Sequence, residues 1–138
     1  MGLVLFVCVE NTFRSVLSEA LFNAMAPGDW RAESAGVQAG ETINPVVLVL
    51  LDEIGIALGP KVPRQVTPDL VARASRVVTF GCLDRCPPGI AGKNDDWPVP
   101  GATGKTMEQL RAIRDDLRRR VVALVADLEG EHSHGTSR

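Results

Sequence analysis

Tyrosine is absent from this sequence, and only 4% of its 138 residues are aromatic. Proteins that bind single-stranded nucleic acid stack bases on aromatic side chains, so this composition argues against that function. An excess of positive charge is also missing, because 15 basic and 17 acidic residues leave a formal net charge of −2. We therefore expect no nucleic-acid and no membrane partner, and any anionic ligand must be attracted by local groups.

Long hydrophobic runs are absent as well. No apolar stretch is long enough to span a bilayer, and the start of the chain lacks the succession of residues typical of a signal peptide. We therefore expect a cytoplasmic protein, and its length favours a single domain. Three cysteines in a reducing compartment argue against a structural disulfide framework. Catalysis, redox cycling and metal binding remain as roles for these thiols.

The pattern of apolar residues predicts strands that alternate with helices. Residues 3–8 form a continuous apolar run, which is typical of a strand buried on both faces. The other expected elements are strands at 30–34 and 76–80, and helices at 15–26, at 44–54 and directly after Thr67-Pro68. This alternation implies an α/β fold with a parallel sheet covered by helices on both faces. Ligands of such folds bind beyond the carboxyl ends of the strands.

The last part of the chain contains the longest irregular segment and the clearest helix. Residues 81–104 are rich in glycine, proline and aspartate, and a loop of this length in a compact domain is usually functional. Thr106 and Gln109 form a capping box, and an apolar stripe then runs from Leu110 to Leu128. We expect one domain over residues 1–128, followed by a disordered polar tail over 129–138.

The residues from Cys8 to Ser15, directly after the first expected strand, concentrate the chemistry of the sequence. A loop closed between a cysteine and an arginine can turn its backbone N–H groups inward and bind an anion. The start of the following helix adds positive potential there, which also favours the thiolate of Cys8. Arg14 is spaced to hold a tetrahedral oxyanion with two parallel hydrogen bonds. The alternative is a buried cysteine acting as a small apolar residue, but its position before Arg14 and Ser15 favours a nucleophile.

Cys82 and Cys86 follow the third expected strand, so the fold places Cys82 at the same edge of the sheet as Cys8. Half of a zinc site is one alternative, but no second pair of ligands lies nearby, and His132 and His134 fall in the expected tail. Two unreactive loop thiols are the other alternative. If Cys8 is a nucleophile, however, a second thiol can resolve its oxidised adduct and a third can take over the disulfide.

The order of these motifs resembles that of the low-molecular-weight protein tyrosine phosphatase superfamily, and within it the thioredoxin-coupled arsenate reductases of archaeal type. The resemblance extends over residues 3–128. It is carried by these segments: the loop Cys8–Ser15 with Asn11 and Arg14 in register, Ala32–Gly36, Ile43–Pro45, Glu53–Ile56, the pair Cys82 and Cys86, Asp96-Trp97, and Gly104-Lys105.

This resemblance implies an α/β three-layer sandwich in which a four-stranded parallel sheet carries the Cys-x5-Arg loop after its first strand. It implies that Cys8 attacks arsenate, that Arg14 stabilises the oxyanion, and that Asn11 and Ser15 support the loop and the thiolate. Cys82 would then release arsenite by forming a disulfide with Cys8, and Cys86 would take over that disulfide for a thioredoxin-like reductant. No cofactor and no metal ion are expected. The loop residues that would bind the arsenate or phosphate oxyanion are Val9, Glu10, Asn11, Thr12, Phe13, Arg14 and Ser15.

The sequence departs from the phosphatase pattern inside the loop and at the general acid. Phe13 stands where the phosphatases have a second loop cysteine, and Glu10 stands where glycine is usual. A carboxylate beside an anion site is unfavourable unless it points to solvent or pairs with a cation. An alignment without gaps places Gly101 where the family has the aspartate that acts as general acid. Asp95 or Asp96 is then the candidate proton donor, although neither matches the motif.

We expect the chain to reduce arsenate to arsenite through a cascade of three cysteines. The alternative is a phosphatase acting on phosphotyrosine or small phosphate esters, which needs Cys8 and Arg14 but neither Cys82 nor Cys86. A third hypothesis is a non-catalytic, oxyanion-binding redox protein that has lost its general acid. Dependence of turnover on Cys82 separates the first two hypotheses, and oxyanion binding without turnover favours the third.

Overall fold

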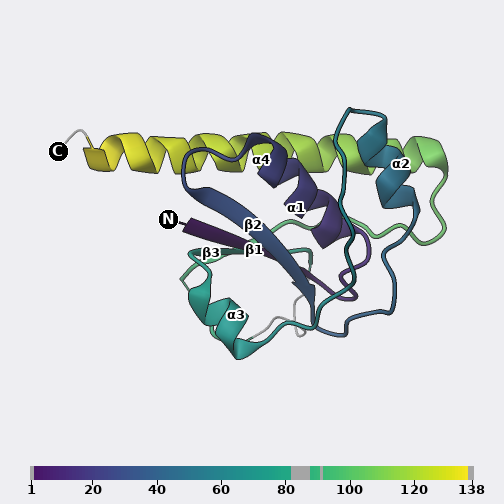
Figure 1. The fold of residues 1–138 in the computed structure, drawn as a ribbon, viewed down its shortest axis with the longest axis horizontal. Helices are drawn as coiled ribbons and strands as arrows, with labels where there is room; N and C mark the ends of the chain where they lie inside the picture. The colour runs from purple at the N-terminus through teal and green to yellow at the C-terminus, as the bar shows by residue number, and fades with distance from the viewer. Residues whose placement is uncertain (1, 82–87, 91, 137–138) are drawn as a thin grey trace.

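A four-stranded parallel sheet with helices on both faces forms the fold, which confirms the predicted α/β three-layer architecture (Figure 1). The computed structural model describes residues 2–81, 88–90 and 92–136. The spatial order of the strands is β2-β1-β3-β4. The strands are β1 (Gly2–Cys8), β2 (Trp30–Gly36), β3 (Arg76–Thr79) and β4 (Asn94–Asp96). The helices are α1 (Arg14–Met25), α2 (Val46–Asp52), α3 (Pro68–Arg73) and α4 (Met107–Thr136).

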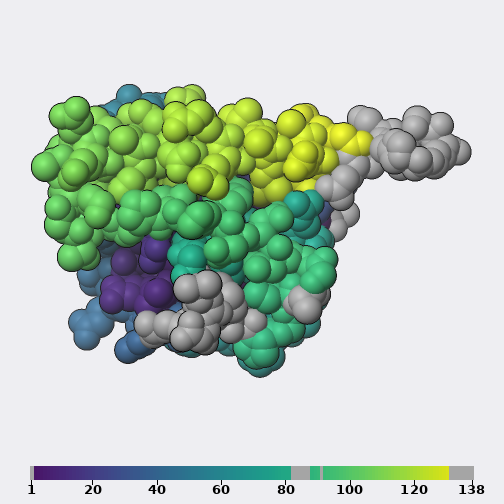
Figure 2. Space-filling view, turned by 180° about the vertical axis from the view of Figure 1, so that it is seen from behind, coloured from purple at the N-terminus to yellow at the C-terminus, as the bar shows by residue number. Residues whose placement is uncertain are grey.

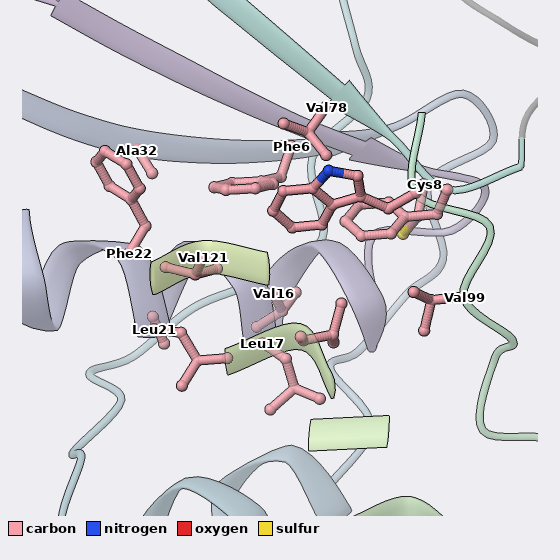
Figure 3. Packing of buried hydrophobic residues seen from close by; sticks show 14 of the residues in the cluster. Phe6, Cys8, Val16, Leu17, Leu21, Phe22, Ala32, Val78, Val99 and Val121 are labelled. Atoms are coloured by element: carbon pink, nitrogen blue, oxygen red, sulfur yellow. The ribbon is translucent and has the colours of Figure 1, made fainter. Parts of the chain in front are cut away.

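Strand β1 lies in the middle of the sheet and is buried along its whole length, as its continuous apolar run predicts. Successive side chains of a strand point to opposite faces, so β1 contributes to two cores. Val4, Phe6 and Cys8 belong to the larger core, together with residues of α1, α2 and α4. Leu3, Leu5 and Val7 belong to a smaller core on the other face, where α3 packs. Cys8 therefore faces the side of the sheet that α1 covers (Figure 3).

The predicted boundaries of the early elements are correct to within two residues, and two of the predicted helix starts are confirmed in detail. Thr67 caps α3, because its Oγ1 accepts a hydrogen bond from the N–H of Leu70 at 3.2 Å. Thr106 and Gln109 form the capping box before α4, with reciprocal hydrogen bonds of 2.8 and 3.1 Å. These caps satisfy N–H groups that the first turn of a helix cannot pair internally.

The segment 81–104 contains strand β4, which the polar sequence Asn94-Asp95-Asp96 does not predict. Three residues of low strand propensity form this strand because they pair with β3, with Thr79 opposite Asp96. Side chains add to the pairing: Arg76 forms an ion pair with Asp95 at 2.8 Å. Tertiary pairing at the sheet edge thus overrides the local preference for a loop.

Helix α4 runs across one face of the molecule and extends past Leu128, where the predicted domain ends (Figure 1). A disordered tail is expected from Glu129, but the structure continues the helix to Thr136. Leu128 is buried in the larger core, so the last residues of the helix follow a turn that is already packed. Adding residues to a formed helix is favourable even where no apolar stripe continues. Among the described residues, no helix has the length and apolar character needed to cross a membrane.

Candidate active site

The site is a short loop that joins the end of β1 to the start of α1. Cys8 is the last residue of β1, and α1 begins at Arg14, so residues 9–13 make the connection. Figure 3 shows the sulfur of Cys8 at the end of the cluster that contains Phe6, Val16 and Leu17. Cys8 is 7% exposed and ends β1, so it lies where the apolar core meets the carboxyl edge of the sheet.

The carbonyl groups of this loop are bound from outside by the segment that follows β2. The N–H groups of Val37, Gln38, Gly40 and Asn44 donate to the carbonyls of Cys8, Val9, Glu10 and Thr12, at 3.1, 2.8, 2.9 and 3.0 Å in that order. A loop whose carbonyls are turned outward presents its amide groups on the inner side. Such a concave set of N–H groups attracts anions.

Among the described residues, few groups accept hydrogen bonds from the inner N–H groups. The N–H of Asn11 donates to the sulfur of Cys8 at 3.2 Å. Within the described part of the chain, the N–H groups of Thr12, Phe13 and Arg14 have no acceptor, and no side chain caps α1. Unpaired amides at the start of a helix are a binding site for a tetrahedral anion.

A relay of hydrogen bonds links the backbone N–H of Arg64, through Asn11 and Ser15, to the sulfur of Cys8. The backbone N–H of Arg64 can only donate, and it donates to Oδ1 of Asn11 at 2.8 Å. The Nδ2 group of Asn11 therefore faces Ser15 and donates to its Oγ at 2.8 Å. The Oγ atom of Ser15 also lies 2.9 Å from the sulfur of Cys8, where either atom can be the donor, so the hydroxyl donates when Cys8 is a thiolate. These donors stabilise negative charge on the sulfur.

Asn11 makes this relay through an unusual backbone conformation. It is the one described non-glycine residue with a positive φ, at 58°, and it is fully buried. Asparagine tolerates the left-handed region better than most residues, because its short side chain can form local hydrogen bonds. In this conformation the backbone N–H of Asn11 donates to the sulfur of Cys8, and its side-chain amide donates to the hydroxyl oxygen of Ser15.

Arg14 is held at the side of the loop by two backbone carbonyls. Its Nη1 donates to the oxygen of Phe80 at 3.2 Å and to that of Val99 at 2.9 Å. Phe80 follows β3, and Val99 precedes α4, so segments far apart in the sequence orient this guanidinium. Figure 2 shows the purple N-terminal part of the chain reaching the surface beside the green segment that leads to α4. Gly101 lies against the same guanidinium, since a Cβ built on it would lie 3.9 Å from Nε of Arg14.

Gly36 lets the end of β2 approach the loop closely. A Cβ at this position would lie 2.6 Å from the carbonyl oxygen of Val9 and 2.9 Å from the backbone nitrogen of Asn11. Real Cβ atoms do not reach such distances, and the atoms that would be hit belong to the backbone. Glycine is needed here because the strand and the loop are packed backbone against backbone.

Replacing Gly36 with Ala is expected to displace the loop and to lower stability by about 1–3 kcal/mol, the usual result of overpacking a tight site. Phosphate should then protect Cys8 poorly from alkylation by iodoacetamide, because the inner amides move. Gly59→Ala is the matched control, since nothing lies within 4 Å of the Cβ that it would add. Equal phosphate protection in the two variants would show that the contact of β2 with the loop is unimportant.

The structure shows where the loop places Glu10 and Phe13, the two residues at which it departs from the phosphatase pattern. The side chain of Glu10 is exposed, so the carboxylate lies in solvent, as a site for anions requires. Phe13 is 5% exposed and packs into the larger core, so the position of the missing second cysteine is filled by an apolar anchor. Val9 and Thr12 are half-buried. Of the predicted loop residues, Cys8, Asn11, Arg14 and Ser15 are those whose side chains meet around the sulfur or border the loop.

Asp95 and Asp96, the candidate proton donors, have other partners in β4. Asp95 forms its ion pair with Arg76. The Oδ1 atom of Asp96 accepts from the hydroxyl of Thr79 at 2.6 Å and from the N–H of Gly81 at 2.8 Å. These contacts hold both carboxylates at the edge of the sheet that β4 forms. Cys82 and Cys86 lie outside the described residues, so their predicted roles stay predictions.

Several groups of the site could not be identified by sequence reasoning. They are backbone groups: the N–H of Arg64, the carbonyls of Phe80 and Val99, and the amides after β2 that bind the loop from outside. A backbone group has no residue type that would mark it. Gly36 could have been identified from the sequence, since a glycine at the end of a strand often marks a close approach of two backbones.

Comparison with known proteins agrees with this geometry. Residues 3–86 match the family described as low molecular weight phosphotyrosine protein phosphatase. A protein of Halobacterium salinarum named a putative arsenate reductase is 32% identical over 124 residues, which cover 86% of this chain and 87% of that protein.

Solved structures show the same fold. An arsenate reductase from Archaeoglobus fulgidus is 35% identical with a TM-score of 0.72, over 89% of this chain and 98% of that chain. A thioredoxin-dependent arsenate reductase from Corynebacterium glutamicum is 28% identical with a TM-score of 0.81, over 95% of this chain and 63% of that chain. The family match includes β1, the loop from Cys8 to Ser15 and β3, which are the parts that build the site. The chain therefore belongs to the low molecular weight phosphotyrosine protein phosphatase family.

Proposed function

We propose that this protein is an arsenate reductase in which Cys8 is the nucleophile. The observation that carries the proposal is the position of the Cys8 sulfur, which accepts from the N–H of Asn11, lies 2.9 Å from the hydroxyl oxygen of Ser15 and borders a loop whose carbonyls are bound from outside. Relatives at 32% and 35% identity carry the name arsenate reductase, which supports this substrate over others of the same shape.

In the first step, the loop amides and Arg14 bind arsenate. The thiolate of Cys8 attacks the arsenic of dihydrogen arsenate, an arsenic–sulfur bond forms, and one hydroxyl leaves as water after it takes the proton of the other hydroxyl. Arg14 and the start of α1 stabilise the charge of the bound oxyanion, because both present N–H groups to the same place.

The second step needs a further thiol, and we assign it to Cys82. Its thiolate attacks the sulfur of Cys8, a disulfide forms, and the arsenic–sulfur bond breaks. The electron pair of that bond passes to arsenic, so pentavalent arsenic leaves as trivalent arsenite and two thiols are oxidised. Cys86 then attacks Cys82, which frees Cys8 and leaves a Cys82–Cys86 disulfide.

The cycle closes when an external dithiol reduces that disulfide. A thioredoxin-like protein is the proposed reductant, because the Corynebacterium glutamicum relative is described as thioredoxin-dependent. A reductant of this kind is present in a reducing compartment, so the cytoplasm is the proposed location.

Hydrolysis of phosphate esters is the second candidate function, and the family match favours it. It uses the same nucleophile and the same arginine, but the ester oxygen must be protonated as it leaves. Asp95 and Asp96 are held by other groups of β3 and β4, which weighs against this candidate.

One preparation assayed in two ways decides between these functions. Arsenite formation is measured with thioredoxin, thioredoxin reductase and NADPH, and hydrolysis of 4-nitrophenyl phosphate is measured in parallel. The proposal expects sustained arsenite formation that stops in Cys82→Ala, with weak hydrolysis that the same variant leaves unchanged. Strong hydrolysis without arsenite formation would contradict the proposal. Glutaredoxin with glutathione is tested as a second reductant in the arsenite assay.

A further inference from the structure

One peptide group connects the guanidinium of Arg14 to the carboxylate of Asp96. It is the peptide group between Phe80 and Gly81, directly after β3. Its carbonyl oxygen, which belongs to Phe80, accepts a hydrogen bond from Nη1 of Arg14 at 3.2 Å. Its N–H, which belongs to Gly81, donates to Oδ1 of Asp96 at 2.8 Å. The cation and the anion therefore bind opposite ends of the same peptide group.

The two hydrogen bonds strengthen each other, because each charge meets the end of the peptide dipole that it favours. The carbonyl oxygen is the negative end and lies against the guanidinium, while the N–H is the positive end and lies against the carboxylate. Hydrogen bonds in such a chain polarise one another, so a peptide group whose N–H is bound by a carboxylate is a better acceptor at its carbonyl. Asp96 thus strengthens the contact that holds Nη1 of Arg14.

The carboxylate of Asp96 is itself held by β3, although the residue is exposed. The hydroxyl of Thr79, which is fully buried, lies 2.6 Å from Oδ1 of Asp96 and 3.2 Å from Oδ1 of Asn94. The N–H of Trp97 donates to the carbonyl of Thr79 at 2.7 Å. A side-chain bond and a backbone bond therefore fix the end of β4 against the core of the sheet.

Gly81 has the backbone conformation that this arrangement needs. Its φ is 71°, in the left-handed region that favours glycine. Space is not the reason for a glycine here, because a Cβ would meet only the Cα of Pro98, at the ordinary contact distance of 3.9 Å. A residue with a Cβ would move φ out of this region, and the peptide group between Phe80 and Gly81 would turn with it.

The two carbonyls on Nη1 decide which part of Arg14 is left for a ligand. Nη1 donates to the oxygen of Phe80 and, at 2.9 Å, to that of Val99, which follows β4. Among the described residues, Nε and Nη2 of Arg14 have no acceptor. Nε and Nη2 carry the parallel N–H groups that bind two oxygens of a tetrahedral anion. The direction of the Phe80 carbonyl thus influences how these two donors are presented.

We propose that Asp96 is a positioning residue of the oxyanion site and acts on Arg14 through the peptide group between Phe80 and Gly81. It fixes the carbonyl that binds Nη1, and it thereby keeps Nε and Nη2 free and oriented for a tetrahedral oxyanion. Asp96 performs this role as a hydrogen-bond acceptor and not as a proton donor. The proposal rests on the part of the proposed function in which Arg14 binds an oxyanion, and it does not require the reduction of arsenate.

Two variants of Asp96 and one control test this role, with inorganic phosphate as the probe and protection of Cys8 against iodoacetamide as the measurement. Asp96→Ala removes the acceptor, so phosphate affinity should fall about fivefold. Asp96→Asn keeps an oxygen at the same place and should stay within about twofold of the wild type. Asp95→Ala is the matched control, because it removes the neighbouring carboxylate of β4, which pairs with Arg76; its affinity should also stay within about twofold.

A double-mutant cycle with Arg14→Lys separates positioning from a general loss of structure. Lysine gives up the contacts with the carbonyls of Phe80 and Val99, so Asp96→Ala should change the phosphate affinity of the Arg14→Lys protein by less than about twofold. An equal fivefold loss in both backgrounds would overturn the proposal, because it would mean that Asp96 acts without Arg14. Unchanged affinity in Asp96→Ala with wild-type Arg14 would overturn it as well.

Gly81→Ala disturbs the same peptide group without touching the carboxylate, so it keeps the proposal testable if Asp96→Ala does not fold. Phosphate affinity should fall about fivefold, as in Asp96→Ala, whereas Gly59→Ala, whose added Cβ has nothing within 4 Å, should match the wild type. Equal affinities in the two glycine variants would contradict the proposal. Failure of the wild type to form arsenite would contradict the proposed function instead, and the phosphate titrations would still decide the role of Asp96.

Discussion

Replacing Cys8 with Ser is expected to lower arsenate reduction by about 10⁴-fold or more, the usual result of removing a covalent nucleophile. The hydroxyl of serine is a far weaker nucleophile than a cysteine thiolate, and it cannot form the disulfide whose formation passes an electron pair to arsenic. Arsenite formation with thioredoxin as reductant measures this loss. The variant should still bind phosphate, because the amides of the loop and Arg14 are unchanged.

Ser15→Ala is the matched control for Cys8→Ser, because it keeps the nucleophile and removes one donor to it. A hydrogen bond to a charged group contributes about 1.5–3 kcal/mol, so alkylation of Cys8 by iodoacetamide at neutral pH should slow by about tenfold. The Cys8→Ser result would count against the mechanism if the variant reduced arsenate at more than a few per cent of the wild-type rate. An unchanged alkylation rate in Ser15→Ala would show that the relay through Asn11 does not act on the sulfur.

Replacing Arg14 with Lys is expected to weaken oxyanion binding by about 10²-fold, even though the charge is kept. Lysine cannot supply two parallel donors, and each charge-assisted hydrogen bond contributes about 1.5–3 kcal/mol. The shorter reach of its single ammonium also gives up the contacts with the carbonyls of Phe80 and Val99 that orient the arginine. Titration of inorganic phosphate against the rate of Cys8 alkylation gives the affinity directly.

Arg31→Lys is the control for Arg14→Lys. Arg31 lies on β2, its side chain is 58% exposed, and it pairs with Glu33 at 3.1 Å. Its replacement should leave phosphate affinity within about twofold, because exposed ion pairs contribute little. Equal affinities in the two variants would mean that Arg14 contributes only its charge and that its two-donor geometry is unimportant.

The parts of the fold that could be predicted are those whose local pattern and packing agree. The continuous apolar run of β1 and the capping box and apolar stripe of α4 are examples, and both elements were predicted with nearly correct starts. Strand β4 could not be predicted from its residues, because pairing with β3 and the ion pair of Asp95 hold a polar segment extended. The resemblance to a known family, which implies four strands, compensated for this missing signal.

The candidate site, like the fold, could be predicted only in part. The spacing of Cys8, Arg14 and Ser15 predicts an anion-binding loop, and the structure places the Ser15 hydroxyl 2.9 Å from the sulfur of Cys8 and Arg14 at the start of α1. Backbone groups orient these side chains: the N–H of Arg64 sets the orientation of the Asn11 amide, and two carbonyls set the direction of Arg14. Such groups are present in every residue, so only the folded chain shows which of them are used.

One measurement tests the central claim most directly, and it uses the reduced Cys86→Ser protein with a single addition of arsenate and no reductant. Arsenite is quantified, and the disulfides are mapped by mass spectrometry of the alkylated, digested protein. We expect one arsenite per protein molecule and a disulfide that joins Cys8 to Cys82. Absence of arsenite, or arsenite formed while Cys8 remains a free thiol, would contradict the account.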